Sequence, residues 1–393
     1  MLSVSLFNHF PAIYEKSGLF IIFEEIFRNM KRLFLFLMAV VIPFAQGFSA
    51  DKAPKNEKVK NVILIIGDGM GYAATCSWMI DRGYAPTAFD RAQFVGFSKT
   101  YSANSRVTDS AASGTAMACG VKTNNGMLGM TPDKTPVPSI AAYAKEKGLS
   151  TGIVVTSYIL DATPGAFFAH VPQRGMRKEI IDDLIQFKPD VIVGGGKKYF
   201  IDPESVPENM IDKAVREGFT FVETPEDFYS TRKTPILGLF ADGSYPMAIE
   251  RDTDFLRDAA MHTIDILDDN KKGFFAMIEG SHIDHAEHAN NAQQLTFEME
   301  EFDKLLTAVF DYADTHKGTL VVVTADHETG GVTLVSAGKD SDSTTGIDVK
   351  FGTTGHSGIG VPIFSYGASA WKFGQVMENI EIFSRIKALL IGK

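Results

Sequence analysis

Six short apolar runs, separated by helical stretches, constrain the architecture of this chain. They are rich in β-branched residues, and they read NVILII (residues 61–66), TGIVVT (151–156), DVIV (190–193), GFFAMI (273–278), TLVVVT (319–324) and VPIFSY (361–366). Continuous apolar runs of this length are typical of strands buried on both faces of a parallel sheet. Helical patterns lie between them, including residues 139–147, 255–270 and 292–315. The sequence therefore predicts an α/β fold in which helices sandwich a large, mostly parallel central sheet.

Length and composition fit one large domain of this kind. The chain has 393 residues, of which 45% are hydrophobic and 22% are charged. Two regions interrupt the pattern: a peripheral excursion at about 202–246, rich in Pro and turn residues, and a short insertion at about 337–355, rich in Gly, Ser, Thr and Asp. The net charge of -10 argues against a broad nucleic-acid-binding surface, which requires a basic face.

The N-terminal region predicts export. From Met30 the chain reads MKRLFLFLMAVVIPFAQGFSA, with two basic residues, an apolar run and then small residues. This is the layout of a secretory signal peptide, and the apolar run is short for a membrane span. We interpret residues 1–29 as a mis-called start, 30–50 as the signal peptide, with cleavage after Gly47 or Ala50, and 51–393 as one domain of an exported protein, periplasmic or secreted. Export would allow Cys76 and Cys119 to form a disulfide, but the sequence does not decide whether they pair.

Acidic residues follow three of the predicted strands. Asp68 stands between two glycines after the first strand, Glu279 precedes Gly280 at the end of the fourth, and Asp326 follows the fifth. Parallel strands bring their carboxyl ends to one edge of the sheet, where ligands bind in open α/β folds. A single acid there is explained by a helix cap. Three acids together would repel one another unless cations neutralised them, so the pattern predicts a cation site.

Histidines are concentrated in three short segments close to these acids. Five of the nine histidines lie in EGSHIDHAEHANNA (279–292), TADHETGG (324–331) and TTGHSGIG (353–360). Asp284 and His288 are four residues apart and would project from one side of a helix, which suits zinc. His327 directly follows Asp326, and His356 lies among glycines. His282 and His285 could each be a ligand, a support for a ligand or a surface residue.

The stretch VTDSAASGTAMACG (107–120) predicts a thin helix with a polar start. Thr108, Asp109 and Ser110 are all preferred helix caps, so capping alone could explain them. The start of the helix also offers free N–H groups and a positive dipole end, which bind phosphate oxygens. The small side chains that follow would let a phosphate and metal ions approach the backbone.

Six segments together resemble the ordered motifs of the alkaline phosphatase family. They are NVILIIGDGMG, VTDSAASGTAMACGVKT, DATPGAFFAHVPQR, EGSHIDHAEHANNA, VVVTADHETGG and TTGHSG, and the match runs from about Asn61 to Tyr366. The resemblance implies two Zn²⁺ ions and one Mg²⁺ ion. Residues implied as ligands of the first zinc are Asp284, His288 and His356; of the second zinc, Asp68, Asp326 and His327, with Ser110 beside it; and of the magnesium, Asp68, Thr163 and Glu279.

The resemblance also implies an activity. A chain of this family would hydrolyse phosphate monoesters with broad specificity through a covalent phosphoserine on Ser110, releasing inorganic phosphate and an alcohol. Arg174 would bind the phosphate, Asp109 would orient Arg174, and Asp161 and His285 would support the phosphate. The short spacing from His327 to His356 implies a reduced crown-type insertion, and the chain would be a monomer or a homodimer without a stable membrane span after signal removal.

Related activities are the alternatives. Asp161 and His285 combine residue types that relatives use separately, which bears on magnesium binding and on water-mediated phosphate contacts. Sulfatases carry Cys or Ser followed by x-Pro-x-Arg, whereas Ala-Ala-Ser follows Ser110. Phosphodiesterases of the same superfamily typically lack an arginine matching Arg174. A phosphodiesterase, a phosphonate hydrolase and a non-catalytic metal- or phosphate-binding protein stay open as alternatives.

Overall fold

The computed structural model describes Met30 and residues 57–251 and 253–392. The predicted mis-called start, signal peptide and cleavage positions therefore lie outside the described residues, apart from Met30. The described residues from 57 onward belong to one compact unit.

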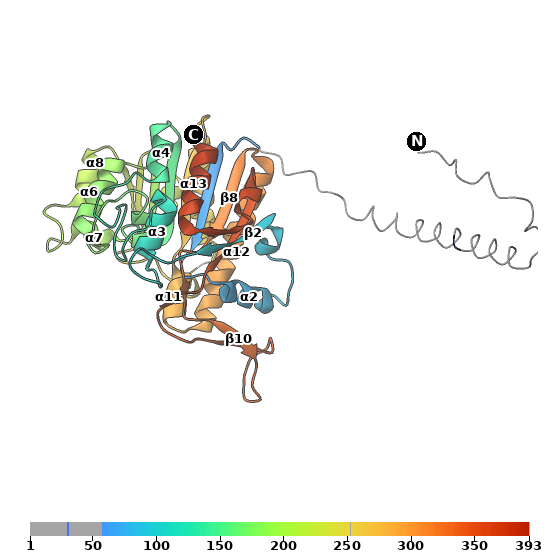
Figure 1. The fold of residues 1–393 in the computed structure, drawn as a ribbon. Coiled ribbons are helices and arrows are strands. Elements are labelled where there is room, and N and C mark those ends of the chain that lie inside the picture. Colours follow the sequence, from blue (N-terminus) through green and yellow to red (C-terminus); the bar gives the residue numbers. More distant parts are fainter. Residues whose placement is uncertain (1–29, 31–56, 252, 393) are drawn as a thin grey trace, which may run out of the picture. The chain divides into compact units, whose positions relative to one another are not determined.

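A ten-stranded sheet forms the centre of this unit (Figure 1). Its strands lie in the order β14-β2-β13-β8-β1-β7-β3-β4-β6-β5. All neighbours are parallel except those of β13, which is antiparallel to both β2 and β8. The predicted fold class is confirmed. The strands are β1 (Asn61–Gly67), β2 (Phe94–Lys99), β3 (Ser150–Tyr158), β4 (Val191–Gly195), β5 (Thr220–Val222), β6 (Ile236–Leu239), β7 (Phe274–Gly280), β8 (Thr319–Thr324), β13 (Val361–Gly367) and β14 (Val376–Glu378).

Helices surround the sheet. They are α2 (Tyr72–Asp81), α3 (Ser110–Cys119), α4 (Ile140–Glu146), α5 (Ala162–Gly165), α6 (Arg177–Phe187), α7 (Lys197–Ile201), α8 (Met210–Arg216), α9 (Pro225–Tyr229), α10 (Phe255–Asp268), α11 (His282–His288), α12 (Ala292–Thr315) and α13 (Asn379–Leu390). Short 3-10 turns lie at Ala88–Arg91, Ala248–Glu250 and Ala370–Phe373.

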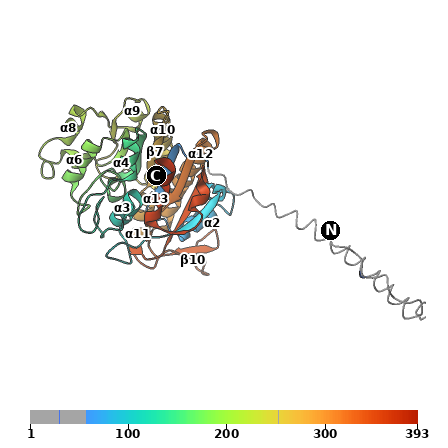
Figure 2. The same ribbon diagram turned by 45° about the horizontal axis from the view of Figure 1, so that its top comes forward.

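Both faces of the sheet are buried, as the continuous apolar runs predict. Alternate side chains of β1 enter two separate cores: Leu64 and Ile66 lie in one core, and Ile63 and Ile65 in the other. Helices α3, α4, α6 and α13 contribute to the first core, and α2, α10 and α12 to the second. Figures 1 and 2 show α3, α4 and α13 on the same side of the sheet.

Parallel pairing aligns the ends of the central strands. Gly67 of β1 lies opposite Gly280 of β7, and Ile66 lies opposite both Glu279 and Thr324. Asp68, α11 and Asp326 therefore begin at the same edge of the sheet. Helices α3 and α11 lie near each other at this edge in both ribbon views.

The two interruptions of the pattern take distinct forms. Residues 202–246 contain α8 and α9 and supply β5 and β6, the last two strands at one edge of the sheet. Residues 337–355 lie within a segment that forms small strands, β9 (Glu328–Thr329), β10 (Thr333–Ser336), β11 (Ile347–Lys350) and β12 (His356–Ser357). Strands β10 and β11 pair as an antiparallel hairpin, and β12 pairs with β9.

Cys76 is exposed, Cys119 is buried, and both are free thiols. Within the described residues, every helix is too short or too polar to cross a membrane.

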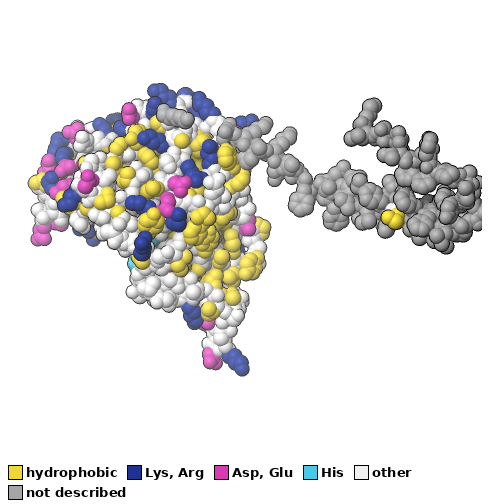
Figure 3. Space-filling model, viewed as in Figure 1, with side chains coloured by type: hydrophobic (Ala, Val, Ile, Leu, Met, Phe, Trp, Pro, Cys, Tyr) yellow, Lys and Arg dark blue, Asp and Glu magenta, His cyan; other side chains and the backbone are white. Residues whose placement is uncertain are grey.

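Figure 3 shows apolar side chains gathered where Figure 1 places β2 and α2; the exposed ones include Tyr72 and Val95.

Glu298 on α12 is an acid that the fold keeps close to its neutral form. Its side chain is 3% exposed, and one of its oxygens accepts a hydrogen bond of 2.7 Å from the backbone N–H of Ala248. Burial, together with the nearby Glu301 carboxylate, raises the pKa of Glu298 to about 8.

We expect Glu298→Gln to remove a pH-dependent loss of stability. Because the folded-state pKa lies above the unfolded value of about 4.3, folding retains a proton on Glu298. The contribution of this proton to the free energy of unfolding is complete below about pH 4 and is lost as the pH rises through about 8. Between about pH 4.5 and 8 the wild type should lose about 1.4 kcal/mol of unfolding free energy per pH unit relative to the variant, and above pH 8 the difference should stop growing. Urea unfolding at several pH values measures the difference, and parallel pH profiles would contradict it.

Candidate active site

Two groups of metal-ligating side chains meet at the carboxyl edge of the sheet. In the first group, Nε2 of His288 and Nε2 of His356 lie 3.2 and 3.7 Å from the two carboxylate oxygens of Asp284. The second group comprises Asp68, Asp284 and His327, and Nε2 of His327 lies 3.4 Å from the Asp68 carboxylate. Asp284 belongs to both groups, so one carboxylate joins the two candidate metal positions.

Asp326 completes the second group. Its Oδ2 lies 3.2 Å from Nε2 of His327, and its Oδ1 accepts hydrogen bonds from the backbone N–H groups of Gly69 and His327. These bonds hold one oxygen of Asp326 on the backbone and leave the other facing the imidazole. Gly69 has a φ of +76°, and an added Cβ would lie 2.9 Å from the Cα of Asp284, so a side chain at residue 69 would push α11 away.

The three imidazoles are oriented by bonds from their Nδ1 atoms. Nδ1 of His288 lies 2.6 Å from the carbonyl oxygen of Thr354, and Nδ1 of His356 lies 2.9 Å from that of Thr108. Because a carbonyl can only accept, these Nδ1 atoms carry the proton. In the neutral ring, Nε2 then presents a lone pair to the carboxylates, which is the arrangement of metal-binding histidines.

Thr329 orients the third imidazole. Its hydroxyl donates a hydrogen bond of 2.5 Å to Asp284, so it accepts from Nδ1 of His327, 3.1 Å away. The sequence gives no signal for this role, because Thr329 is distinguished only by its place two residues after His327.

The residues present fit divalent cations. Asp68 Oδ1, Glu279 Oε2 and Asp326 Oδ2 are buried and have no hydrogen-bond partner among the described residues. Burial, followed by the charges of neighbouring carboxylates, raises the pKa values of Asp68 and Glu279 well above their usual range. Lone pairs and carboxylates that face one another without a proton between them repel, and a bound cation removes that repulsion.

The Asp284 side chain already attracts positive charge. Although burial opposes its ionisation, the hydrogen bond with His288 and the charge of His327 hold the pKa of Asp284 well below its usual range. The same hydrogen bond raises the pKa of His288 to about 9, despite partial burial of the ring. A positive charge between these groups, as a proton or as a metal ion, is therefore favoured.

Glu279 lies close to the second metal group, and Thr163 is buried on a helix that packs on α3. Glu279 is 1% exposed at the end of β7, and it interacts electrostatically with Asp68. Thr163 is 1% exposed on α5, directly after Asp161 and Ala162, and α5 packs on α3. Carboxylate and hydroxyl oxygens suit magnesium better than zinc.

Ser110 is the first residue of α3 and faces the second metal group. Its hydroxyl lies 3.2 Å from Nε2 of His327, and the residue is 4% exposed. The cap of α3 is Asp109, whose Oδ1 accepts a hydrogen bond of 3.0 Å from the N–H of Ala112. The alternative that Ser110 is only a helix cap is therefore wrong. The Ser110 hydroxyl is left available for chemistry.

Small residues in α3 serve close packing. An added Cβ at Gly114 would lie 3.1 Å from the Cβ of Ala166 and 3.5 Å from the Cα of Thr163, which is tight contact. Ser113 donates a hydrogen bond of 2.6 Å to the carbonyl oxygen of Asp326. The thin helix thus brings Ser110 close to both the metal-ligand segment after β8 and the Thr163 segment.

Arg174 lies between two carboxylates. Its Nη2 donates to Asp161 at 2.9 Å, and its Nη1 lies 3.6 Å from Asp109. Burial opposes the charged form, but these two carboxylates raise the pKa of Arg174 above its usual value. Asp109 also accepts a hydrogen bond of 2.9 Å from the N–H of Gly126, so the residue that caps α3 connects the Ser110 helix to the arginine.

Comparisons with known proteins decide the family. The sequence model described as alkaline phosphatase matches residues 59–341. Alkaline phosphatase 4 of Bacillus subtilis is 38% identical over 342 residues, which cover 80% of this chain and 73% of that protein. The chain belongs to the alkaline phosphatase family.

Solved structures agree with this assignment. The alkaline phosphatase from the Antarctic bacterium TAB5 matches with a TM-score of 0.81 and 34% identity, covering 86% of this chain and all of that one. A variant of the TAB5 enzyme with Mg bound in its M3 site matches with a TM-score of 0.80 and 36% identity, covering 85% of this chain and 99% of that one. The fold is therefore that of a phosphatase of this family.

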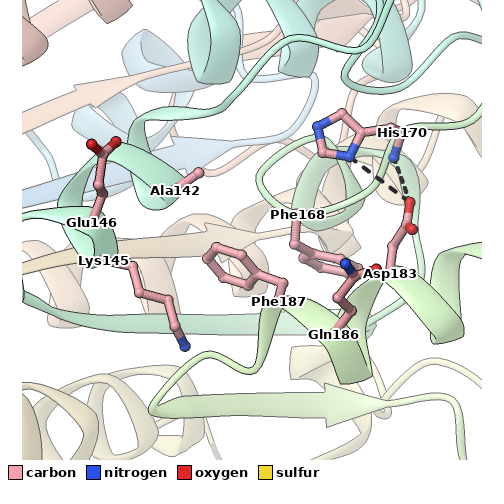
Figure 4. A pocket seen from close by; sticks show the side chains of 8 residues that line it. All are labelled: Ala142, Lys145, Glu146, Phe168, His170, Asp183, Gln186 and Phe187. Atoms are coloured by element: carbon pink, nitrogen blue, oxygen red, sulfur yellow. Dashed lines mark hydrogen bonds and ion pairs between the residues drawn. The ribbon is translucent and has the colours of Figure 1, made fainter.

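The loop that carries Arg174 in this alkaline phosphatase is anchored outside the metal groups. The backbone N–H of His170 donates a hydrogen bond of 2.7 Å to Asp183 on α6, and the N–H of Arg174 donates one of 2.7 Å to the carbonyl of Gly126. Figure 4 shows His170 and Asp183 at one end of a hollow of about 430 Å³ between α4 and α6. The hollow shares no residue with the candidate site.

His285, a predicted support for the phosphate, contacts His282 among the described residues. Its Nδ1 lies 2.8 Å from Nδ1 of His282, and among the described residues no hydrogen bond joins it to Arg174 or Asp161. The ring is half-buried on α11, one residue after Asp284.

We expect Asp284→Asn to weaken zinc binding at both metal positions. The substitution keeps the shape of the side chain but removes the negative charge that the two groups share. Loss of a charged ligand should reduce zinc affinity by about 100-fold or more. Loss of a residue that only hydrogen-bonds to a ligand typically reduces metal affinity by about 10- to 100-fold. Competition with a chromophoric chelator measures the affinity.

Asp212→Asn provides the control for this substitution. Asp212 is an exposed residue of α8, outside both metal groups, and its substitution causes the same change of charge. Equal zinc affinity in Asp284→Asn and Asp212→Asn would contradict the shared-ligand assignment.

Proposed function

We propose that this chain hydrolyses phosphate monoesters with broad specificity through a covalent phosphoserine on Ser110. The observation that carries the proposal is the position of the Ser110 hydroxyl, at the start of α3 and 3.2 Å from Nε2 of His327. The products are inorganic phosphate and an alcohol.

Two Zn²⁺ ions and one Mg²⁺ ion would occupy the site. Residues that would hold the first zinc are Asp284, His288 and His356; the second zinc, Asp68, Asp326 and His327, with Ser110 beside it; and the magnesium, Asp68, Thr163 and Glu279. When bound, these ions supply Lewis acidity that lowers the pKa of an oxygen ligand and neutralises charge on phosphate and leaving-group oxygens.

The chain itself binds and orients the phosphate. The guanidinium of Arg174 matches two non-bridging phosphate oxygens, and Asp161 and Asp109 fix its direction. The first N–H groups of α3 and the dipole of that helix favour a phosphoryl group beside Ser110. His285 would support the phosphate from the adjacent helix α11.

The reaction has two displacement steps at phosphorus. The Ser110 oxygen forms a bond to phosphorus while the bond from phosphorus to the alcohol oxygen breaks. Ser110 loses one proton in this step, and the departing alcohol gains one. Water then attacks the phosphoserine, which releases inorganic phosphate and restores the hydroxyl. Arg174 holds two of the non-bridging oxygens through both steps.

The setting of the activity follows from the sequence. The layout of residues 30–50 supports export to the periplasm or the medium, where small phosphate monoesters are the substrates and the net charge disfavours nucleic acid. The working unit is a monomer or a homodimer.

We expect Ser110→Ala to abolish turnover while leaving the bound metal ions in place. The variant lacks the only oxygen that forms the covalent intermediate, so hydrolysis of p-nitrophenyl phosphate should fall by at least about 1,000-fold. Acid quenching of the wild type with labelled substrate should trap phosphate on Ser110. Metal content checks the site, and Ser384→Ala on α13 is the matched control. A wild type that binds phosphate but turns over no ester would support the binding-protein alternative instead.

We expect Arg174→Ala to weaken phosphate binding more than it slows the bond-breaking steps. Loss of two charge-assisted hydrogen bonds should raise the inhibition constant of inorganic phosphate by about 10- to 100-fold. Arg177→Ala is the control. Arg177 lies three residues after Arg174 in the chain, but its guanidinium packs on the ring of Tyr199. Rates on a monoester and on a diester should be compared in the same preparations. A wild-type preference for the diester would favour the phosphodiesterase alternative.

A further inference from the structure

His282 and His285 form a hydrogen-bonded pair beside the metal groups. Their Nδ1 atoms lie 2.8 Å apart, and their ring centres lie 4.9 Å apart. His282 is 1% exposed, and its Nε2 lies 2.7 Å from the carbonyl oxygen of Tyr245. Both nitrogens of His282 are therefore in use, whereas His285 has one nitrogen left.

The direction of these hydrogen bonds follows from donor and acceptor chemistry. The Tyr245 carbonyl can only accept, so Nε2 of His282 carries a proton. A neutral imidazole carries a single N–H, so Nδ1 of His282 accepts, and Nδ1 of His285 donates to it. The opposite direction requires a positively charged His282, which the burial of this ring disfavours. Among the described residues, Nε2 of His285 is the nitrogen of this pair that has no hydrogen-bond partner.

Backbone contacts fix the pair to the strand that leads to Asp161. The N–H of Tyr245 donates a hydrogen bond of 3.1 Å to the carbonyl of Thr156 on β3. The N–H of Ser281, just before His282, donates one of 2.9 Å to the Thr156 hydroxyl. Thr156 of β3 thus anchors both Tyr245, which contacts Nε2 of His282, and Ser281, which precedes His282.

Helix geometry places His285 at the flank of the metal-binding side of α11. With about 100° between successive residues, His285 lies about 60° around the helix from His288 and about 100° from Asp284. His282 lies further around, on the side turned toward Tyr245. The half-buried ring of His285 therefore stands between the buried support and the metal groups.

We infer that His282 is a positioning residue: it accepts the Nδ1 proton of His285 and so directs Nε2 of His285 toward the phosphate, or toward a water that the phosphate holds. The role of His285 at the phosphate rests on the proposed function, whereas the ring geometry and the position of the proton do not.

Two substitutions at residue 282 separate the two hydrogen bonds. In His282→Gln, the amide N–H can still reach the Tyr245 carbonyl, but no acceptor stands at the place of Nδ1. In His282→Asn, the amide oxygen stands near the place of Nδ1 and can accept from His285, but the bond to Tyr245 is lost. We expect His282→Gln to raise the inhibition constant of inorganic phosphate and the KM of p-nitrophenyl phosphate by about fivefold with little change in kcat. His282→Asn should restore most of this loss.

A double-mutant cycle shows whether His282 acts through His285. In the metal-loaded protein, adding His282→Gln to His285→Ala should cause no further loss of phosphate affinity, because the ring to be positioned is absent. His262→Gln is the matched control: Nε2 of His262, on α10, lies 3.0 Å from the carbonyl of Thr231, so the same substitution keeps the same type of carbonyl bond away from the site. Additive losses in the double variant would overturn the proposal and leave His282 as a packing residue.

Nitrogen NMR of histidine-labelled, metal-loaded wild type gives a readout independent of turnover. His285 should carry its proton on Nδ1, and this preference should weaken in His282→Gln but not in His262→Gln. A wild-type His285 protonated on Nε2 alone would overturn the proposal. If the wild type shows the expected proton position but hydrolyses no monoester, the proposed function fails and the positioning of His285 by His282 stands.

Discussion

Repulsion among buried carboxylates is the constraint on which the site depends. Parallel pairing of β1, β7 and β8 brings Asp68, Glu279 and Asp326 to one edge, and burial denies them the water that would otherwise stabilise their charges. No lysine or arginine is bonded to these three acids in the described part of the chain, whereas Arg251 and Glu301 pair directly elsewhere in the same protein. The acids therefore need small, mobile cations, and the fold supplies oriented imidazoles rather than fixed positive side chains.

The Ser110 hydroxyl is available for reaction because the neighbouring Asp109 caps the helix. Asp109 performs two structural tasks, since one oxygen caps α3 and the other accepts from Gly126 beside the arginine. Ser110 is thereby relieved of capping. The same principle applies to Asp284, which serves both metal groups, and to Thr329, which passes a hydrogen bond from His327 to Asp284. The site is compact because each of these side chains makes two of the contacts that hold it together.

Local patterns predicted the elements whose sequence signals are continuous. Helix α12 was predicted with the observed bounds, because an amphipathic repeat follows Asn291, which caps it. Strand β2 was missed, because its sequence, FVGFSK, is interrupted and its place between β13 and β14 depends on pairing with distant segments. In the site, acids that directly follow strands were found from sequence, whereas the choice among Thr108, Asp109 and Ser110 as helix cap depended on a loop 16 or 17 residues further along. Contacts across such distances leave no local signal.

The edge of the sheet formed by β5 and β6 has a bearing on how far this protein could be shortened. The chain returns from β6 through Tyr245, whose carbonyl meets His282 and whose N–H meets Thr156. A trimmed chain that ran directly from α7 to α10 would preserve every metal-ligating residue and still lack the backbone that steadies α11. Insertions and deletions should therefore accumulate before residue 243, and homologues of minimal length should retain a substitute for this one carbonyl.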